Sequence, residues 1–343
     1  MVIENLASIR DELYERMESY FDEVEDAITL PWWTDEITVE FRAFAMTGKA
    51  IRGSLVVLAH DLFGGGHRSA ALDAGSAIEL LHSATLIHDD IMDQDETRRG
   101  REATHVRLAR GRDTRTGESL AMNIGNCGFF LGYDVLSRLD IDHETHRRIL
   151  SYYSRNLTKL GLAQMQDVAL AASEELPSED DIERVFVEKS GRYSFSLPLA
   201  IGALIAGSSE RVRFLERFGE DLGFIFQVKD DELNLFGDPS VTGKPVGSDV
   251  RDCKKTLYWH AVATSADPRA SEVRGVFGDR DATIEHIARA TGFLESSGIR
   301  SEIAERMSSR ARVLRESLEK QDFDGKVKAA FAELIEWNLS RVK

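Results

Sequence analysis

Apolar residues recur at spacings of three and four along most of this chain, a pattern typical of amphipathic helices. It predicts helices over residues 3–27, 69–92, 118–139, 143–172, 179–206 and 209–236. No stretch alternates cleanly with a period of two, and the chain has six prolines. We therefore expect an all-α protein.

Glycine-rich and polar stretches divide the predicted helices from one another. They lie at residues 64–66, 100–117, 174–178 and 237–247, and we predict each to be a loop. Residues 283–342 continue the amphipathic helical pattern. Because there is no repeat, low-complexity tract or linker, we expect one domain that covers residues 1–343.

Composition narrows the possible partners. The net charge is −16, with 59 acidic and 43 basic residues, so most of the surface repels nucleic acid. Arginine far outnumbers lysine. Scarce lysine together with an excess of acidic residues suggests a protein adapted to high salt. An ordinary acidic enzyme is the alternative, and composition leaves both interpretations open.

The cysteines and apolar runs bear on the compartment. Cys127 and Cys253 are far apart and in no metal-ligand spacing, which argues against a disulfide framework or zinc site and for a reducing compartment. The first 22 residues lack the apolar core of a signal peptide. The longest apolar run, residues 197–207, is too short to cross a bilayer. We expect a cytoplasmic protein without a membrane span.

Three aspartates end an otherwise apolar helical stretch. Asp89 and Asp93 are one helical turn apart, and Asp90 lies three residues before Asp93. At about 6 Å and an effective dielectric near 20, each pair of carboxylates repels by about 3 kcal/mol, and the helix dipole adds to this. We predict a bound cation, and a few hard oxygen donors suit magnesium.

A second acidic pair, Asp230 and Asp231, also follows an apolar helical stretch, and Asn234 comes one turn later. An acidic solvated face is the simpler explanation for either cluster. Both clusters, however, are followed by basic residues in predicted loops. These are Arg98, Arg99 and Arg101 after the first cluster, and Lys244, Lys254 and Lys255 after the second. Carboxylates for metal next to cations for phosphate are what a diphosphate requires.

With these motifs the sequence resembles the trans-isoprenyl (polyprenyl) diphosphate synthase family, from about residue 48 to the C-terminus. The strongest segment is LLHSATLIHDDIMDQDETRRGREATH at residues 80–105. GKAIRG at 48–53, Lys189-Ser190 followed by YSFSLPL, and FQVKDDELNLFGDPSVTGKPVGSDVRDCKKT at 226–256 are also similar. The likeness is greatest to the archaeal and actinobacterial type that makes geranylgeranyl diphosphate.

The resemblance implies antiparallel helices around a deep central cavity, the isoprenoid synthase fold, in a homodimer with the aspartate motifs facing each other. It implies that the diphosphate of isopentenyl diphosphate is held by Lys49, Arg52, His82 and Arg99. It implies that the allylic diphosphate is held by Arg98, Lys189, Ser190, Gln227, Lys244 and Lys254. It assigns Mg²⁺, three ions with substrate bound, to Asp89, Asp93 and Asp230, supported by Asp90 and Asp231.

The implied reaction is electrostatic catalysis of a condensation. The allylic diphosphate (dimethylallyl, geranyl or farnesyl) ionises, and isopentenyl diphosphate attacks the cation to give a linear all-trans product. Metal ions with Arg98, Lys189 and Lys254 would stabilise the departing diphosphate. No serine, cysteine or histidine nucleophile is needed.

Several positions depart from the family pattern. Asn234 stands where a third aspartate is common, and Asn126 also replaces a frequent aspartate. Ala50 and Gly53 replace a frequent arginine and proline in the first basic motif. These departures bear on detail and leave the class unchanged.

Product length is expected to depend on Ala84 and Thr85, which lie one turn before Asp89 and should border the channel. Because both are small, we expect twenty carbons, with twenty-five or more as the alternative. A terpene cyclase or the regulatory subunit of a heteromeric synthase are the other possibilities. Lys49, Arg52 and His82 argue against a cyclase, and the five aspartates argue against a regulatory subunit.

Overall fold

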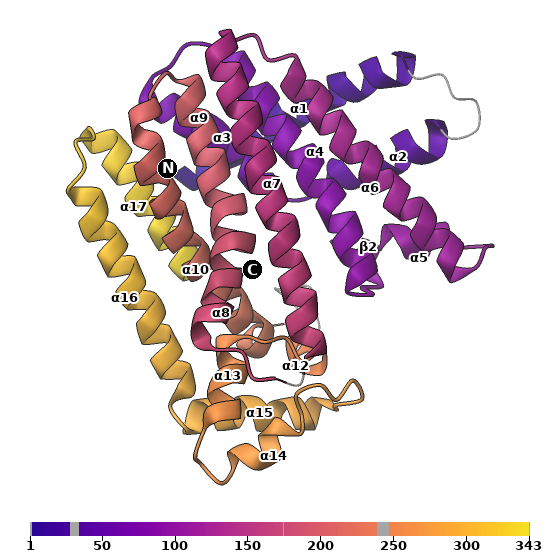
Figure 1. Ribbon diagram of the computed structural model, residues 1–343, viewed down its shortest axis with the longest axis vertical. Coiled ribbons are helices and arrows are strands. Elements are labelled where there is room, and N and C mark those ends of the chain that lie inside the picture. Colours follow the sequence, from indigo (N-terminus) through magenta and orange to yellow (C-terminus); the bar gives the residue numbers. More distant parts are fainter. Residues whose placement is uncertain (1, 28–33, 174, 239–246, 343) are drawn as a thin grey trace. The chain divides into compact units, whose positions relative to one another are not determined.

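The computed structural model describes residues 2–27, 34–173, 175–238 and 247–342 (Figure 1). In these ranges the backbone is helical almost throughout, and the strands are limited to one hairpin of two short strands with two residues each. The all-α prediction is confirmed. Contacts divide the chain into two compact units, Met1–Tyr152 with Pro198–Val212, and Tyr153–Leu197 with Arg213–Lys343.

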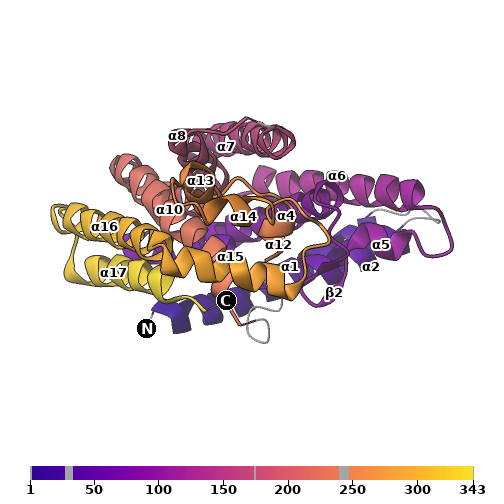
Figure 2. The ribbon, with the colours of Figure 1, turned by 90° about the horizontal axis from the view of Figure 1, so that it is seen from below.

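The first unit is built around one long helix, α4 (Arg68–Met92). One side of α4 contacts α6 (Thr114–Ser137), and the other contacts α3 (Ile51–Phe63) and α1 (Val2–Ala27), an order that Figure 2 shows. The remaining elements of this unit are α2 (Thr34–Ala45), β1 (Thr97–Arg98), β2 (Arg101–Glu102), α5 (Thr104–Leu108), the start of α7 (His143–Ala172), most of α9 (Leu197–Ile205) and the 3₁₀ turn Ser209–Arg211.

Glycines let α4 and α6 approach closely. A Cβ added to Gly128 would lie 3.1 Å from the Cβ of Ala84, and one added to Gly132 would lie 3.0 Å from the carbonyl oxygen of Ala77. Asp113 caps α6, because its side chain accepts a hydrogen bond from the backbone N–H of Thr116. This packing fixes the helix that ends in the first aspartate motif.

The second unit is built on α10 (Val212–Phe236), which contacts the π-helix η1 (Phe186–Ser196) through paired glycines. On another side Phe218 of α10 meets Phe331 of α17 (Gly325–Ser340), with ring centroids 5.0 Å apart. In Figure 1, α16 (Ile299–Glu319) and α17 run side by side. The other elements are the rest of α7, α8 (Glu179–Val185), α12 (Ser248–Arg251), α13 (Leu257–Thr264), α14 (Ala270–Arg274) and α15 (Ile284–Ser296).

Two predictions of secondary structure need correction. The predicted loop 100–117 contains β2, α5 and the first turn of α6, because Asp113 starts a helix earlier than the apolar pattern does. The predicted helix 179–206 is three elements, with η1 between α8 and α9. The predictions over residues 3–27, 69–92 and 143–172 agree with α1, α4 and α7 to within one residue.

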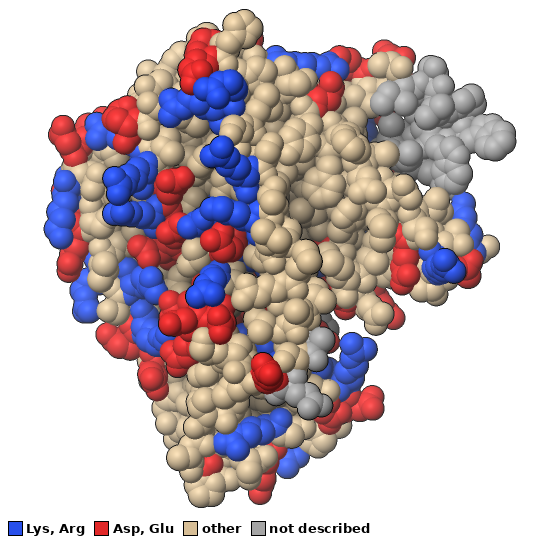
Figure 3. All heavy atoms as spheres, viewed as in Figure 1, with Lys and Arg blue, Asp and Glu red and all other residues tan. Residues whose placement is uncertain are grey.

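The described helices include none with the length and apolarity needed to span a bilayer. In Figure 3, charged side chains of both signs crowd the surface over α16. The surface over α6 carries few. Two apolar side chains of α6 are exposed, Phe130 by 74% and Met122 by 49%.

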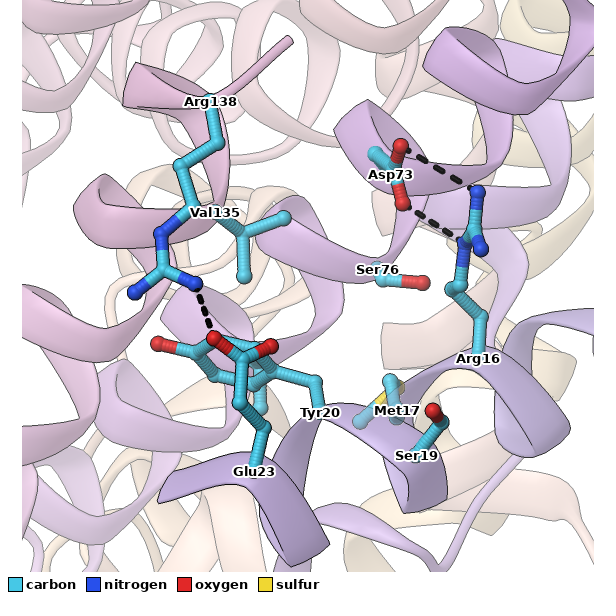
Figure 4. Close-up of a pocket in the computed structure, with 10 residues that line it drawn as sticks. Arg16, Met17, Ser19, Tyr20, Glu23, Asp73, Ser76, Val135 and Arg138 are labelled. Carbon is cyan, nitrogen blue, oxygen red and sulfur yellow. Dashed lines mark hydrogen bonds and ion pairs between the residues drawn. The ribbon is translucent and has the colours of Figure 1, made fainter. Parts of the chain in front are cut away.

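A cavity of 210 Å³ lies between α1, α4 and α6 in the first unit (Figure 4). Arg16 of α1 and Asp73 of α4 point toward each other, with 2.7 Å between Nε and Oδ1. At the other end Arg138 pairs with Glu23 at 2.5 Å. The lining charges therefore balance, and we assign the cavity a structural role.

Candidate active site

The first aspartate motif lies at the carboxyl end of α4, as predicted. Asp93 is the C-cap, and its N–H donates to the carbonyl oxygen of Asp89 at 2.8 Å. Asp93 is exposed, Asp89 is half-buried and Asp90 is fully buried. In the described ranges no three His, Cys, Asp or Glu side chains converge as a metal site, so the assignment of these aspartates to a metal stays a prediction.

Asp90 instead turns toward Arg98. Arg98 Nε donates to Oδ1 of Asp90 at 2.5 Å, and its Nη2 donates to Asp95 at 2.7 Å. Burial raises the pKa of Asp90 to about 6, although the Arg98 charge and hydrogen bond act to lower it. Within the described ranges Oδ2 of Asp90 accepts no hydrogen bond. This buried oxygen is therefore available to a cation or to its water.

The neighbouring arginines reach different clusters because a tight hairpin separates them. Arg98 ends β1, while Arg99 and Gly100 form a two-residue turn with φ of 54° and 73°. Arg99 Nη1 donates to the carbonyl oxygen of Phe44 at 3.3 Å and also to Thr47. The Arg99 guanidinium thus leaves the aspartate motif and enters the basic segment that precedes α3.

A basic cluster forms where this segment meets α4. Arg52 Nη1 and His82 Nε2 are 2.9 Å apart. Burial, followed by the charges of Arg52, Arg99 and Arg98, holds the pKa of His82 well below its usual value, so the ring is neutral and accepts from Arg52. Lys49 is exposed, and a Cβ added to Gly48 would lie 2.7 Å from Cζ of Arg99. The structure brings Arg52, His82 and Arg99 together, and Lys49 precedes Arg52 by three residues.

The second unit holds another cluster, where η1 packs on α10. A Cβ added to Gly223 would lie 2.0 Å from the Cα of Gly191, so both glycines are needed for this approach. Ser190 Oγ donates to Oε1 of Gln227 at 2.7 Å, and Gln227 Nε2 donates to Oδ1 of Asp231 at 3.0 Å. One chain of hydrogen bonds therefore joins three predicted residues.

Asp231 and three lysines line a cavity of 80 Å³ in this unit, Lys189, Lys254 and Lys255. Lys189 Nζ is 2.7 Å from Oδ2 of Asp167, and Lys254 Nζ is 3.4 Å from Oδ1 of Asp249. Burial, followed by the nearby Asp249 charge, raises the pKa of Asp231 well above its usual range. Oδ2 of Asp231 accepts no hydrogen bond within the described ranges. A bound cation would satisfy both the charge and this oxygen.

The other members of the second motif point elsewhere. The Asp230 side chain is 56% exposed and lies 3.4 Å from Nη2 of Arg341. Asn234 Nδ2 donates to Ser248 Oγ at 2.6 Å, and its Oδ1 accepts from the N–H of Asp249 at 3.2 Å. Lys244 lies outside the described residues.

The two residues predicted to set product length differ in their surroundings. Ala84 is fully buried and faces Gly128 of α6. Thr85 is half-buried, and its hydroxyl donates to the carbonyl oxygen of His82 at 2.7 Å. Thr85 is therefore the better placed of the two to affect a neighbouring space, and their role stays a prediction.

Sequence reasoning missed three carboxylates. Asp167 pairs with Lys189, Asp249 with Lys254, and the buried Glu79 accepts from the backbone N–H of Gly53 at 2.7 Å. Glu79 precedes His82 by three residues, so both side chains are on one face of the helix, and this spacing could have indicated Glu79 as a neighbour of the basic cluster. Nothing local in the sequence marks Asp167, since its partner is 22 residues away.

Comparisons with known proteins show the family of this chain. The sequence model of the polyprenyl synthetase family matches residues 37–294. The chain is 34% identical over 220 residues to the geranylgeranyl diphosphate synthase of Sulfolobus acidocaldarius, and the match covers 63% of each chain. It is 32% identical over 271 residues to that of Mycobacterium tuberculosis, which covers 78% of this chain and 73% of the relative.

A solved structure is similar over nearly the whole length. It is geranylgeranyl pyrophosphate synthase from Corynebacterium glutamicum, complexed with isoprenyl diphosphate and magnesium. The TM-score is 0.89 at 26% identity, and the alignment covers 98% of this chain and 99% of the other.

Proposed function

Because the chain belongs to the polyprenyl synthetase family, we propose that it is a prenyltransferase that condenses isopentenyl diphosphate with an allylic diphosphate. The observation that carries the proposal is the separation of Arg98 from Arg99. Arg98 contacts an aspartate motif, whereas Arg99 joins a basic cluster with Arg52 and His82. A condensing enzyme needs two diphosphate sites of these two kinds.

The basic cluster is the proposed site for isopentenyl diphosphate. Lys49, Arg52 and Arg99 supply positive charge, and neutral His82 can donate a hydrogen bond through its other ring nitrogen. This substrate keeps its diphosphate throughout the reaction.

Enzymes of this family use a divalent metal, typically Mg²⁺. The residues of this chain fit such an ion, because Asp90 and Asp231 each bury a carboxylate oxygen that accepts no hydrogen bond within the described ranges. We propose that Asp89, Asp93 and Asp230 hold the metal, with Asp90 and Asp231 in support. Bound Mg²⁺ would neutralise negative charge on the allylic diphosphate and make it a better leaving group.

The protein residues act on the leaving group and the cation that it leaves. Arg98, Lys189 and Lys254 bind the allylic diphosphate as its carbon–oxygen bond breaks and the diphosphate takes the electron pair. The double bond of isopentenyl diphosphate, held by the basic cluster, then forms the new carbon–carbon bond. A proton leaves the adjacent carbon, and we propose the departed diphosphate as its acceptor.

The proposal is tested with purified protein, labelled isopentenyl diphosphate, Mg²⁺ and each allylic starter in turn. We expect an elongated product that disappears with a chelator, at low and at high salt. Lys49→Ala should raise the KM for isopentenyl diphosphate at least about tenfold and leave the allylic KM nearly unchanged. No elongation with any starter would refute the proposal, and activity that requires a second protein would favour a regulatory subunit.

We propose a product of twenty carbons. The supporting observations are the names of the relatives above and the small side chain of Thr85. Thr85→Phe is the useful variant, because Thr85 is partly exposed, whereas Ala84 has no room beside Gly128. A shorter product from Thr85→Phe would support the assignment, and an unchanged length would oppose it.

We also propose that the two units form one catalytic domain and that the protein is a homodimer. The family match runs through both units, which supports the single domain.

Phe130 and Met122 on α6 are exposed apolar side chains of a kind that a second copy would cover. Phe130→Glu should give a monomer by analytical ultracentrifugation. Val313→Glu, on exposed α16, should not change the mass.

A further inference from the structure

A buried carboxylate lies beside the basic cluster of the first unit. Glu79 is 5% exposed and belongs to α4, one helical turn before His82. A buried charge is costly unless it is paired and hydrogen-bonded, so its partners reveal its role. Those partners are in the segment that carries Lys49 and Arg52.

Glu79 caps α3 from outside that helix. The first N–H groups of a helix have no acceptor within it, and Ala50, at the N-cap of α3, provides no side-chain acceptor. Oε1 of Glu79 accepts from the N–H of Gly53 at 2.7 Å, in the first turn. The carboxylate also interacts with the backbone of Arg52. It therefore fixes the start of α3, where Arg52 emerges.

Gly53 makes this contact possible in two ways. A Cβ on Gly53 would lie 2.6 Å from the carbonyl oxygen of Gly75 and 2.9 Å from Cγ of Glu79. The glycine therefore lets α3 and α4 approach closely, and it keeps the N–H that a proline would lack. This accounts for the glycine found at this position of the basic motif.

Charge gives the second half of the argument. Lys49, Arg52 and Arg99 carry three positive charges and must remain together when no diphosphate is bound. Burial raises the pKa of Glu79, while the Gly53 bond and the Arg52 and Arg99 charges act to lower it. When it is ionised, Glu79 offsets one of the three charges, and the two that remain suit a diphosphate.

We propose that Glu79 is a positioning residue for isopentenyl diphosphate, holding the start of α3 and Arg52 in place by a hydrogen bond to Gly53 and a fixed counter-charge. This inference rests on the proposed function of the basic cluster. Glu79 does not touch the substrate in this role, because it acts through the backbone of α3 and through Arg52.

The sign of one measurement tests the proposal. Glu79→Gln keeps the shape and the acceptor oxygen but removes the charge. If Glu79 positions the cations, the KM for isopentenyl diphosphate rises at least about tenfold, while kcat and the allylic KM stay within about threefold. If Glu79 is only a nearby negative charge, its loss strengthens attraction for diphosphate, and that KM stays the same or falls. The second outcome overturns the proposal.

Asp73→Asn is the matched control. Asp73 is on the same helix, nine residues before His82, and it pairs with Arg16 at the cavity in Figure 4. Its KM values should equal those of the wild type. An equal rise of the isopentenyl diphosphate KM in Asp73→Asn would assign the Glu79 effect to general loosening of α4 and overturn the proposal.

Two further measurements keep the test decisive. If Glu79→Gln does not fold, Glu79→Asp keeps the charge but withdraws it by one methylene, and we expect a several-fold rise of the same KM alone; no rise, or an equal rise for both substrates, refutes the idea. Inorganic diphosphate, titrated without metal into wild-type, Lys49→Ala and Glu79→Gln proteins, should bind best to the wild type. That comparison still tests the inference if the wild type elongates nothing, an outcome that refutes only the proposed reaction.

Discussion

At the scale of single residues, charge placement decides the properties of the proposed diphosphate sites. His82 is an example, because burial and its arginine neighbours keep its ring neutral. Glu79 is a second example, because burial raises the pKa of its carboxyl while the Gly53 N–H and the Arg52 and Arg99 charges act to lower it. Neither residue type alone would reveal which protonation state the fold selects.

The lowered pKa of His82 predicts loss of stability in mild acid. Below about pH 6.5 this ring binds a proton in the unfolded chain but not in the folded chain. The free energy of unfolding therefore decreases as the pH falls. The contribution is about 1.4 kcal/mol per pH unit until the folded ring also titrates. Urea unfolding of substrate-free protein between pH 7.5 and 5 measures it.

His82→Gln serves as the comparison, since glutamine can still accept from Arg52 but does not titrate. We expect the free energy of unfolding of this variant to fall less steeply with acid than that of the wild type. Equal slopes would mean that other groups cause the acid effect.

Asn234 provides a second prediction at this scale. Its amide holds Ser248 and the N–H of Asp249, so Asn234→Ala leaves polar groups without partners. We expect a loss of about 1–3 kcal/mol in the free energy of unfolding. Asn123→Ala, which removes one exposed bond to the carbonyl oxygen of Ser119, should change it by no more than about 0.5 kcal/mol. Similar losses from both variants would contradict this account.

At the scale of elements, close helix contacts bring the polar residues together. Gly191 and Gly223 allow η1 to meet α10, and this contact places Ser190 next to Gln227. A π-helical stretch is rare, and such stretches are frequent at functional sites. Here the π-helix contains both Lys189 and Ser190.

Gly223→Ala should therefore be severely destabilising. Its new methyl group would lie 2.0 Å from the backbone of Gly191, so the helices must separate, at a cost of about 3 kcal/mol or more. Gly292→Ala in α15 meets open space and should stabilise by about 0.5–1 kcal/mol through helix propensity. Thermal unfolding compares the two. A mild effect of Gly223→Ala would show that η1 and α10 can repack without this contact.

At the scale of the whole molecule, the net charge of −16 opposes compactness. Salt at about 1 M shortens the screening length to about 3 Å and weakens that repulsion. It also weakens the surface ion pairs, such as Arg306 with Glu179 at 2.8 Å, but exposed pairs contribute little each. We therefore expect that screening of the repulsion between like charges affects stability more than weakening of the ion pairs does.

We accordingly expect the melting temperature to rise by several degrees between about 0.1 and 2 M KCl. Potassium chloride is the right salt, because sulfate would strengthen apolar burial by another route. An unchanged or lower melting temperature would mean that the ion pairs outweigh the repulsion, and it would favour an ordinary acidic protein over one adapted to high salt.

The sequence by itself determined the long helices and the position of the first aspartate motif at the end of one of them. Periodicity over three and four residues is a local property, so residues 69–92 and 143–172 could be assigned from the pattern alone. The position of Asp89 and Asp90 at the end of a helix followed from the same rule. The basic residues after each motif then indicated a diphosphate.

Only the tertiary structure decided which charges meet. Arg98 and Arg99 are adjacent in sequence, yet a turn with two positive φ angles sends them to different clusters. Asp90 accepts a hydrogen bond from Arg98, and Glu79 accepts one from Gly53 on another helix. These outcomes depend on contacts between segments far apart in the chain, where burial sets the strength of each charge, and no local spacing encodes that burial.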